Sequence, residues 1–278
     1  MWWQTARFRI DLALPRVMGI VNVTPDSFSD AGLHHDHRAA IAHCDALVTQ
    51  GADLLDIGGE STRPGATPPG VTEELARVLP VLRHAVTLGV PVSIDTSEPM
   101  VMQAALDLGV DIVNDVRALR RPGALNAVRQ HPRAGLCLMH LRGEPQTMQQ
   151  QGAYTDVVVE VGCFLRERLS DVEAAGIERE RVVLDPGIGF GKSVDDNLAL
   201  LRRQRELTAL GRPLLVGWSR KSTLHALSPR PPAERLGGSV AAALLAVQAG
   251  AAIVRVHDVA ATVDALRLWQ ALGPAAQG

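Results

Sequence analysis

Residues 54–57 read LLDI, residues 72–88 read TEELARVLPVLRHAVTL and residues 90–94 read VPVSI, and this stretch decides the fold. The two short apolar runs are typical of parallel strands that are buried on both faces. The segment between them has the spacing of a helix. The stretch therefore predicts a strand, a helix and a second, parallel strand.

The same strand-helix unit recurs eight times along the chain. Glycines mark many of the returns from helix to strand, where a left-handed cap ends the helix without steric cost. Eight units fit an α/β fold of the (β/α)8 TIM barrel type better than a doubly wound sheet. The predicted strands cover 16–21, 54–57, 90–94, 111–113, 134–139, 181–184, 213–216 and 251–256. The predicted helices cover 37–50, 72–88, 99–108, 123–130, 156–175, 194–210, 233–248 and 259–272.

The length and the composition favour one large core. The chain has 278 residues, of which 46% are hydrophobic, and no linker rich in Gly, Ser and Pro interrupts its middle. We therefore expect a single domain over 1–278 with a core at about 16–272. A short N-terminal segment at 7–14 is expected to cover the bottom of the barrel.

Charge and composition exclude several classes of function. The net charge of −2 leaves no electrostatic footprint for nucleic acid or for an anionic membrane. No signal peptide and no run long enough to span a bilayer is visible. The cysteines Cys44, Cys137 and Cys163 match no zinc or redox spacing. We therefore expect a cytoplasmic protein with buried or half-buried free thiols.

Polar residues stand where nearly every predicted strand ends. In a TIM barrel these ends form one rim, and active sites lie there. Strand ends that exit to water would explain one or two such residues, but not a set with three kinds of charge chemistry. The set comprises Asn22, Gly58, Gly59, Glu60, Asp95, Asn114, His140, Asp185, Ser219, Arg220, Lys221, Arg255 and His257.

The cationic members of this set indicate an anion site. Lys221, Arg255 and His257 are cationic or can become so. If they converge, they would hold a phosphate or a diphosphate, because Arg makes a two-pronged contact and Lys acts as a compact point charge.

The oxygen-bearing members indicate a second kind of recognition. Asp95, Asn114 and Asp185 are acceptors or mixed donor-acceptors. A carboxylate such as Asp185 can accept two parallel N–H bonds, which suits the amino-amide edge of a pterin or a guanine. Asn22, together with diphosphate oxygens and water, suits Mg²⁺.

Two long motifs give the chain a family resemblance. Residues 18–30 (MGIVNVTPDSFSD) and 56–65 (DIGGESTRPG) resemble the two signatures of the dihydropteroate synthases, and shorter motifs follow in the family's order. The resemblance covers about 16–269. It implies a (β/α)8 barrel, Mg²⁺ as cofactor, a homodimer, and two small-molecule substrates, a dihydropterin diphosphate and 4-aminobenzoate. The shorter motifs are 93–97 (SIDTS), 114–116 (NDV), 138–140 (LMH), 185–192 (DPGIGFGK), 217–222 (GWSRKS) and 255–258 (RVHD).

The resemblance also implies a role for each matching residue, and loops at 24–35 and 61–69 that close over the site. Asn22 would be the Mg²⁺ ligand, and the catalytic residues would be Asp95, Lys221, Arg255 and His257. The pterin diphosphate would be bound by Thr62, Asp95, Asn114, Asp185, Lys221, Arg255 and His257. The 4-aminobenzoate side would be formed by Thr62, Arg63, Pro64, Phe190, Ser219 and Ser222, with Ser222 near a helix N-terminus that favours a carboxylate.

Two other functions remain open from the residues. A pterin-dependent methyltransferase would have a related barrel, but it predicts a cobalamin partner domain and gives no reason for the long loop after Asn22. A non-catalytic pterin-binding paralogue is disfavoured because the expected ligands are present.

Three further patterns predict no chemistry of their own. The glycine-rich run at 187–193 resembles a phosphate loop, but Pro186 stands where the Walker pattern needs glycine. Lys221 could form a Schiff base at a strand end, as in aldolases, although the signatures disfavour this. The histidines His34, His35 and His37 have the wrong spacing for one regular metal site and favour a solvated loop.

Overall fold

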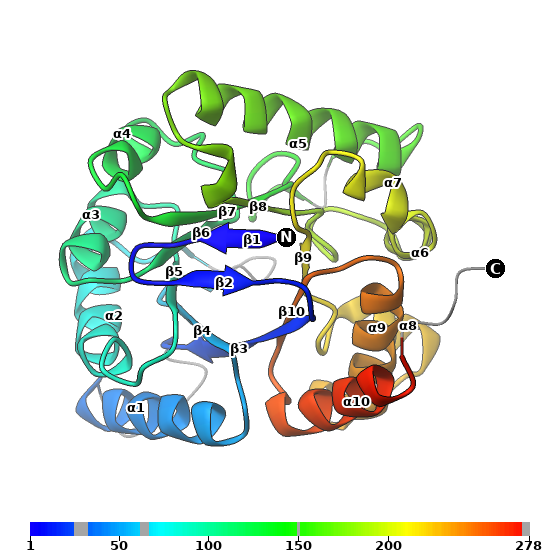
Figure 1. Cartoon of the computed structure of the whole chain (residues 1–278), viewed down its shortest axis with the longest axis horizontal. Coiled ribbons are helices and arrows are strands. Elements are labelled where there is room, and N and C mark those ends of the chain that lie inside the picture. The colour runs from blue at the N-terminus through cyan, green and yellow to red at the C-terminus, as the bar shows by residue number, and fades with distance from the viewer. Residues whose placement is uncertain (25–32, 62–66, 149–150, 274–278) are drawn as a thin grey trace.

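The computed structural model describes residues 1–24, 33–61, 67–148 and 151–273, and eight parallel strands form its centre (Figure 1). The sheet order is β8-β7-β6-β5-β4-β3-β10-β9. The sheet closes where Leu184 forms a parallel bridge with Leu214 and donates its N–H to the Pro213 carbonyl at 3.0 Å. The predicted TIM barrel is confirmed. The strands are β3 (Arg16–Asn22), β4 (Leu54–Gly58), β5 (Val92–Asp95), β6 (Ile112–Asp115), β7 (Gly135–Met139), β8 (Val182–Asp185), β9 (Leu215–Val216) and β10 (Ile253–Val256).

Helices surround the barrel, and three differ from the sequence prediction. Helix α1 begins at Leu33 rather than at residue 37, so the expectation of a loop at His34, His35 and His37 is wrong. The helix expected at 194–210 is broken at Arg203, whose backbone (φ −107°, ψ 15°) leaves the helical region while its guanidinium pairs with Asp156. The helix expected at 233–248 begins later, and α8 and the 3₁₀ turn η4 precede it unpredicted. The elements are α1 (Leu33–Thr49), α2 (Val71–Ala85), α3 (Pro99–Asp107), α4 (Ala124–Arg129), α5 (Val157–Ala174), η3 (Arg179–Arg181), α6 (Val194–Arg202), α7 (Gln204–Thr208), α8 (Ser222–Leu227), η4 (Pro232–Glu234), α9 (Leu236–Gln248) and α10 (Val259–Ala271).

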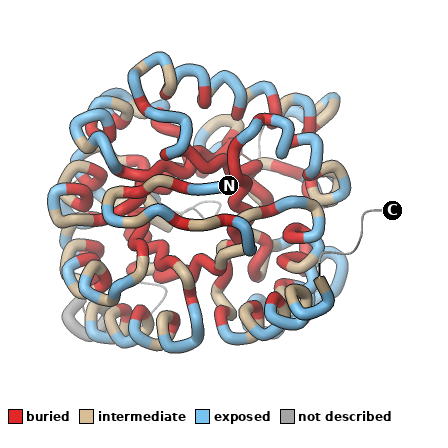
Figure 2. Tube along the Cα trace, in the orientation of Figure 1, coloured by how far each residue is buried: buried red, intermediate tan, exposed pale blue. Residues whose placement is uncertain are grey.

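Each barrel strand supplies two layers of buried side chains, because successive side chains of a strand point to opposite faces. In β4, Leu55 and Ile57 join the core between strands and helices, whereas Leu54 joins a second cluster inside the barrel. Figure 2 shows the strands as the most continuously buried part of the chain, with exposure concentrated on the outer faces of the helices.

An N-terminal hairpin closes one end of the barrel. Strands β1 (Trp2–Gln4) and β2 (Arg9–Asp11) pair antiparallel and lie across the barrel in the view of Figure 1. The fully buried Trp3 packs in the cluster inside the barrel and donates its indole N–H to the Arg181 carbonyl at 2.9 Å. The segment expected to cover the bottom of the barrel therefore begins near residue 2 rather than at residue 7.

The thiols and the helices agree with most of the sequence expectations. All three cysteines are free, and Cys44 and Cys137 are buried, but Cys163 is exposed, so the prediction of burial is wrong for that residue. Among the residues that the structure describes, no helix is long and apolar enough to cross a bilayer.

Candidate active site at the C-terminal ends of the strands

The predicted polar residues gather at one end of the barrel. The register aligns Asn22 of β3 with Gly58 of β4, Gly58 with Asp95 of β5, and Asp95 with Asn114 of β6. All eight strands run in the same direction, so these residues and those at the ends of β8 and β10 meet at the opposite end from the hairpin. This is the end at which TIM barrels carry their active sites.

Arg255 lies at the centre of this site, between two carboxylates. Its Nε donates to Asp56 Oδ2 at 2.6 Å, and its Nη2 donates to Asp95 Oδ2 at 2.8 Å. Asn114 donates its amide N–H to the same Asp56 oxygen at 3.1 Å. Asp56 is completely buried, and the sequence analysis assigned it no role although it begins the second long motif. A polar residue inside the apolar run 54–57 was the signal that could have identified it.

The two carboxylates and the guanidinium influence one another strongly. Burial, followed by the nearby Asp56 carboxylate, raises the pKa of Asp95, while Arg255 opposes that rise. Burial lowers the pKa of the Arg255 guanidinium, but the carboxylates of Asp56 and Asp95 outweigh it and raise that pKa, so the guanidinium stays charged. The site thus holds a permanent cation between two acidic groups at the C-terminal end of the barrel.

Asp185 and Lys221 occupy the opposite side of the rim. Asp185 is buried and its Oδ1 accepts the Gly187 N–H at 2.7 Å. Burial raises its pKa to about 6, against the effects of that N–H and of Lys221. Burial, followed by the charge of Arg255, lowers the pKa of Lys221 to about 8. The Lys221 ammonium lies 4.1 Å from the centre of the Phe190 ring, so a predicted pterin ligand and a predicted aminobenzoate contact are neighbours.

A buried lysine that the sequence analysis left without a role holds the loop after Asp185. Lys192 Nζ donates to the carbonyls of Gly187 at 2.8 Å and Phe190 at 3.1 Å, and it lies 3.0 Å from His140 Nδ1. Burial lowers the pKa of Lys192 to about 7. Burial, followed by the charge of Lys192, lowers the pKa of His140 to about 2, so this imidazole is neutral. The pair fixes the loop that carries Phe190.

Gly187 can only be glycine at this place in the loop. Its φ is +68°, and a Cβ there would lie 2.1 Å from the His140 carbonyl oxygen. Glycine adopts such a conformation without steric cost, and a missing side chain permits close approach. The glycine-rich run therefore shapes the Asp185 loop.

Ser219 and His257 form the remaining side of the rim. The Ser219 hydroxyl accepts the backbone N–H of His257 at 3.1 Å and lies 3.0 Å from its Nδ1. Burial, followed by the charge of Arg255, lowers the pKa of His257 to about 3, so its imidazole is neutral near pH 7. Ser222 is the first residue of α8, which agrees with its predicted place at a helix start.

A second buried arginine links three loops of the rim, and sequence reasoning missed it. Arg117 is 1% exposed; its Nε donates to Glu144 at 2.6 Å and its two terminal nitrogens donate to Glu60 at 3.2 and 3.1 Å. These residues follow β4, β6 and β7. Glu60 precedes the second predicted loop, so Arg117 anchors the base of that loop.

Some predicted site residues lie outside the described part of the chain. Thr62, Arg63 and Pro64 belong to the segment 62–66, and much of the first expected loop falls in 25–32. Asn22 is described, half-buried, at the end of β3. Within the described ranges no group of three His, Cys, Asp or Glu side chains could hold a metal ion.

Comparison with known proteins places the chain among pterin enzymes. A family model described as pterin binding enzyme matches residues 18–257. The dihydropteroate synthase of Neisseria meningitidis serogroup B is 52% identical over 98% of this chain and 97% of its own length. The Xanthomonas albilineans dihydropteroate synthase, solved with 4-aminobenzoic acid, is 53% identical with a TM-score of 0.90, covering 95% of both chains. The Burkholderia cenocepacia enzyme, solved with 7,8-dihydropteroate, is 50% identical with a TM-score of 0.89, covering 98% of this chain and 96% of that one.

Proposed function

The chain belongs to the pterin-binding enzyme family and within it to the dihydropteroate synthases, and from this premise we propose how its own residues carry out the reaction. The chain joins a (7,8-dihydropterin-6-yl)methyl diphosphate to 4-aminobenzoate and releases pyrophosphate. The observation that carries the proposal is the hydrogen-bonded cluster of Asp56, Asp95, Asn114 and Arg255 at the strand ends, with Asp185 at the end of β8 on the same rim.

The pterin ring is assigned to the acceptors on the strands. Asp185 uses Oδ1 for the Gly187 N–H, and its second oxygen can accept from the amino-amide edge of the ring. Asn114 donates one amide N–H to Asp56, and its carbonyl oxygen and its second N–H can bind the ring. Lys221 adds a donor beside these acceptors. The ring would therefore lie within the barrel end.

The reaction is a substitution at the methylene carbon of the pterin. The C–O bond to the diphosphate breaks with the electron pair leaving on oxygen, and the amine nitrogen donates its lone pair to form the C–N bond. The nitrogen then loses a proton to solvent. Arg255 and Lys221 would stabilise the departing diphosphate by their charge and the neutral His257 by a hydrogen bond, while Asp95 would stabilise positive charge that develops on the pterin.

Magnesium fits the residues at the end of β3. Asn22 is half-buried there and offers a hard oxygen, the ligand type that Mg²⁺ prefers. The described residues offer no group of three acidic or imidazole ligands, so the diphosphate and water would supply the other oxygens. When bound, Mg²⁺ would act as a Lewis acid on the leaving group.

The 4-aminobenzoate side is proposed at Phe190, Ser219 and Ser222, with Thr62, Arg63 and Pro64 from the loop after β4. Phe190 is held by Lys192 through its carbonyl and faces the Lys221 ammonium. A flat apolar ring and two hydroxyls suit an aromatic carboxylate.

A direct assay tests the function. The protein is given the dihydropterin diphosphate, 4-aminobenzoate and Mg²⁺, and pyrophosphate and dihydropteroate are measured, with 4-aminobenzoate omitted as the control. Equal amounts of both products are expected. No product from a folded protein that still binds the pterin would instead favour a non-catalytic paralogue. Methyl transfer to a cobalamin protein would favour the methyltransferase alternative.

A homodimer is the proposed assembly, and two adjacent helices offer a surface for it. Leu245 of α9 is 52% exposed, and Leu268 and Leu272 in and after α10 are 65% and 78% exposed. We expect Leu268→Glu to shift the mass measured by light scattering from dimer to monomer. Met100→Glu, at a comparably exposed position on α3, is the matched control and should leave the mass unchanged. A cytoplasmic location stays a prediction.

A further inference from the structure

The turn after β9 contains a backbone conformation that its residue disfavours. Arg220 has φ of +60°, and among the described residues only Ala118 and Leu119 share a positive φ without being glycine. Such a conformation brings Cβ close to the backbone, and it persists only where the surrounding structure holds it in place. Contacts from outside the turn should therefore hold Arg220.

Three contacts from later parts of the chain hold Arg220. Its guanidinium makes a two-pronged pair with Asp258, with Nε–Oδ2 at 3.1 Å and Nη2–Oδ1 at 2.6 Å. Its backbone N–H donates to Ser239 Oγ at 3.0 Å. Its carbonyl accepts from Arg235 Nη1 at 2.8 Å. The side chain and both backbone polar groups of this one residue are thus fixed.

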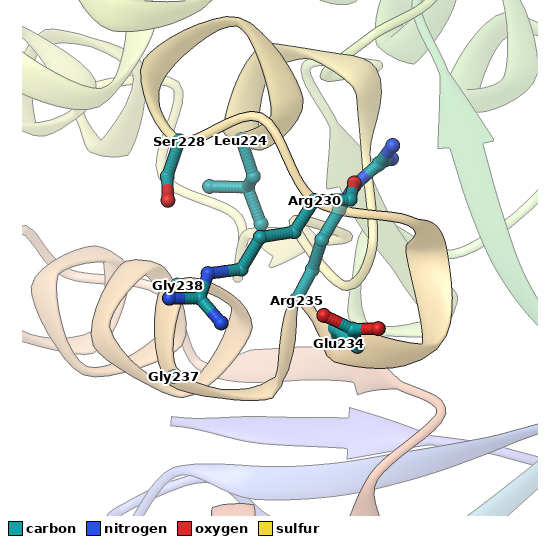
Figure 3. A pocket seen from close by; sticks show the side chains of 7 residues that line it. All are labelled: Leu224, Ser228, Arg230, Glu234, Arg235, Gly237 and Gly238. Carbon is teal, nitrogen blue, oxygen red and sulfur yellow. The ribbon is translucent and has the colours of Figure 1, made fainter.

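Arg235 connects the turn to the cavity between α8 and α9. Figure 3 shows it among the residues that line this cavity, with Leu224 and Ser228 on the α8 side and Gly237 and Gly238 at the start of α9. Its Nε also donates to the Arg230 carbonyl at 2.8 Å. The Arg235 guanidinium therefore links the 228–235 segment to the carbonyl of Arg220 in the turn.

The residues on either side of Arg220 belong to the proposed site. Ser219 bonds to His257, and Lys221 lies over Phe190. Asp258 directly follows His257, so the Arg220–Asp258 pair joins the ends of β9 and β10 beside the Ser219–His257 bond. A turn that relaxed toward negative φ would change the directions of Ser219 and Lys221 together.

We propose that Arg220 and Asp258 are positioning residues whose pairing, with Arg235 and Ser239, holds a left-handed turn that aims Ser219 and Lys221 into the site. The proposal rests on the proposed function. It assigns Arg220 no contact with substrate; its effect on the reaction passes through the backbone.

The test compares Arg220→Gly with Arg220→Val in the full chain. Both variants lose the guanidinium, but only glycine adopts positive φ readily, whereas a β-branched residue strongly resists it. We expect the Gly variant to keep kcat/KM within roughly threefold of the parent and the Val variant to lose about tenfold or more, the equivalent of about 1.4 kcal/mol. If the Val variant does not fold, Arg220→Ala takes its place with a smaller expected loss.

A second substitution tests the pairing itself. Asp258→Asn should lower kcat/KM about fivefold when residue 220 is Arg, but change it little in the Arg220→Gly chain, where no strained conformation needs to be held. An equal loss of kcat/KM from Asp258→Asn in the Arg220 chain and in the Arg220→Gly chain would overturn the proposal. A Val variant that keeps the kcat/KM of the parent would overturn it too. A Gly variant as impaired as the Val variant would also overturn it, since the guanidinium itself would then be required. Absence of dihydropteroate with the parent chain would instead refute the proposed function.

Discussion

The two ends of the barrel are built from the same strands, but the side chains inside one end are apolar and those inside the other are charged or polar. On the inner face of β4, β8 and β10, the first residue is apolar and packs under the N-terminal hairpin, while the residue two positions later is charged and belongs to the site. Residues two apart on a strand share a face. The pairs are Leu54 and Asp56, Val183 and Asp185, and Ile253 and Arg255.

The residues that stabilise the fold and the residues of the site therefore lie only about two positions apart on the same strand. The lower layer buries apolar surface, which favours folding. The upper layer buries charges, whose desolvation works against folding unless each one is paired. Arg255 reduces that cost by contacting Asp56 and Asp95 together, and the Gly187 N–H does the same for Asp185. Substitutions at the two ends should therefore affect different measurements.

The largest expected effect is on stability at the hairpin end. Trp3→Ala removes a fully buried side chain and leaves a cavity, which should lower the free energy of unfolding by about 3–5 kcal/mol. Denaturant unfolding measures this, and the kcat of the folded fraction should stay near the parent value. Trp2→Ala, where the side chain is 43% exposed, is the matched control. Similar losses for both variants would contradict a core role for Trp3.

The second effect is on turnover at the charged end. Arg255→Ala removes a preorganised cation and leaves Asp56 and Asp95 without their partner, so kcat should fall on the order of 10²-fold or more. Steady-state formation of dihydropteroate measures it. The control is Arg133→Ala at an exposed position. Near-normal turnover of the Arg255 variant would remove the proposed mechanism.

The third effect tests whether the charged layer costs stability. Burial raises the pKa of Asp185 from 3.8 to about 6. Between pH 3.8 and about 6 the folded state therefore binds this proton more tightly than the unfolded state. Stability should then fall as pH rises through about 4 to 6, with the cost fully present above that window. Asp185→Asn lacks this cost and should gain up to roughly 3 kcal/mol relative to the parent between pH 4 and 7.

Urea unfolding across that pH range measures the gain, and the same variant should have lost turnover. Asp195→Asn replaces an exposed carboxylate in the first turn of α6 and serves as the control. Parallel stability curves for Asp185→Asn and the parent would show that the buried carboxylate carries no such cost.

The smallest expected effect is on stability, at the exposed start of α6 near the charged end of the barrel. Ser193 caps α6 by accepting the Asp196 N–H at 3.1 Å, and the two residues form a capping box. Ser193→Ala should lower stability by about 1 kcal/mol. Turnover should not change, because the residue faces solvent at the helix start. A large loss of kcat would show that the loop after Asp185 depends on this cap.

Much of the site could be predicted because it follows from local pattern. A polar residue directly after a buried run marks a strand end, and parallel strands bring such ends together. This reasoning placed Asp95, Asn114, Asp185 and Arg255 at one end of the barrel. Their individual roles stay predictions, as do those of Thr62, Arg63 and Pro64 outside the described residues.

The contacts that organise the site could not be predicted in the same way. Asp56 and Arg255 are 199 residues apart, and nothing in the apolar run around Asp56 indicates its partner. The Lys192–His140 contact and the Arg117–Glu60 pair likewise join residues of different units. A periodic pattern carries information about one strand or one helix at a time.

The sequence by itself determined the eight strand-helix units, the rim of polar residues and, through two long motifs, the family. These features depend on hydrophobic periods of two residues in strands and 3.6 in helices, and on contiguous sequence motifs, and all of these are local. Only the tertiary structure decided which charges pair, how the hairpin fills the lower end, and that Arg220 is held in a left-handed turn. Barrel closure sets those outcomes, because it places side chains from distant strands within hydrogen-bonding distance of one another.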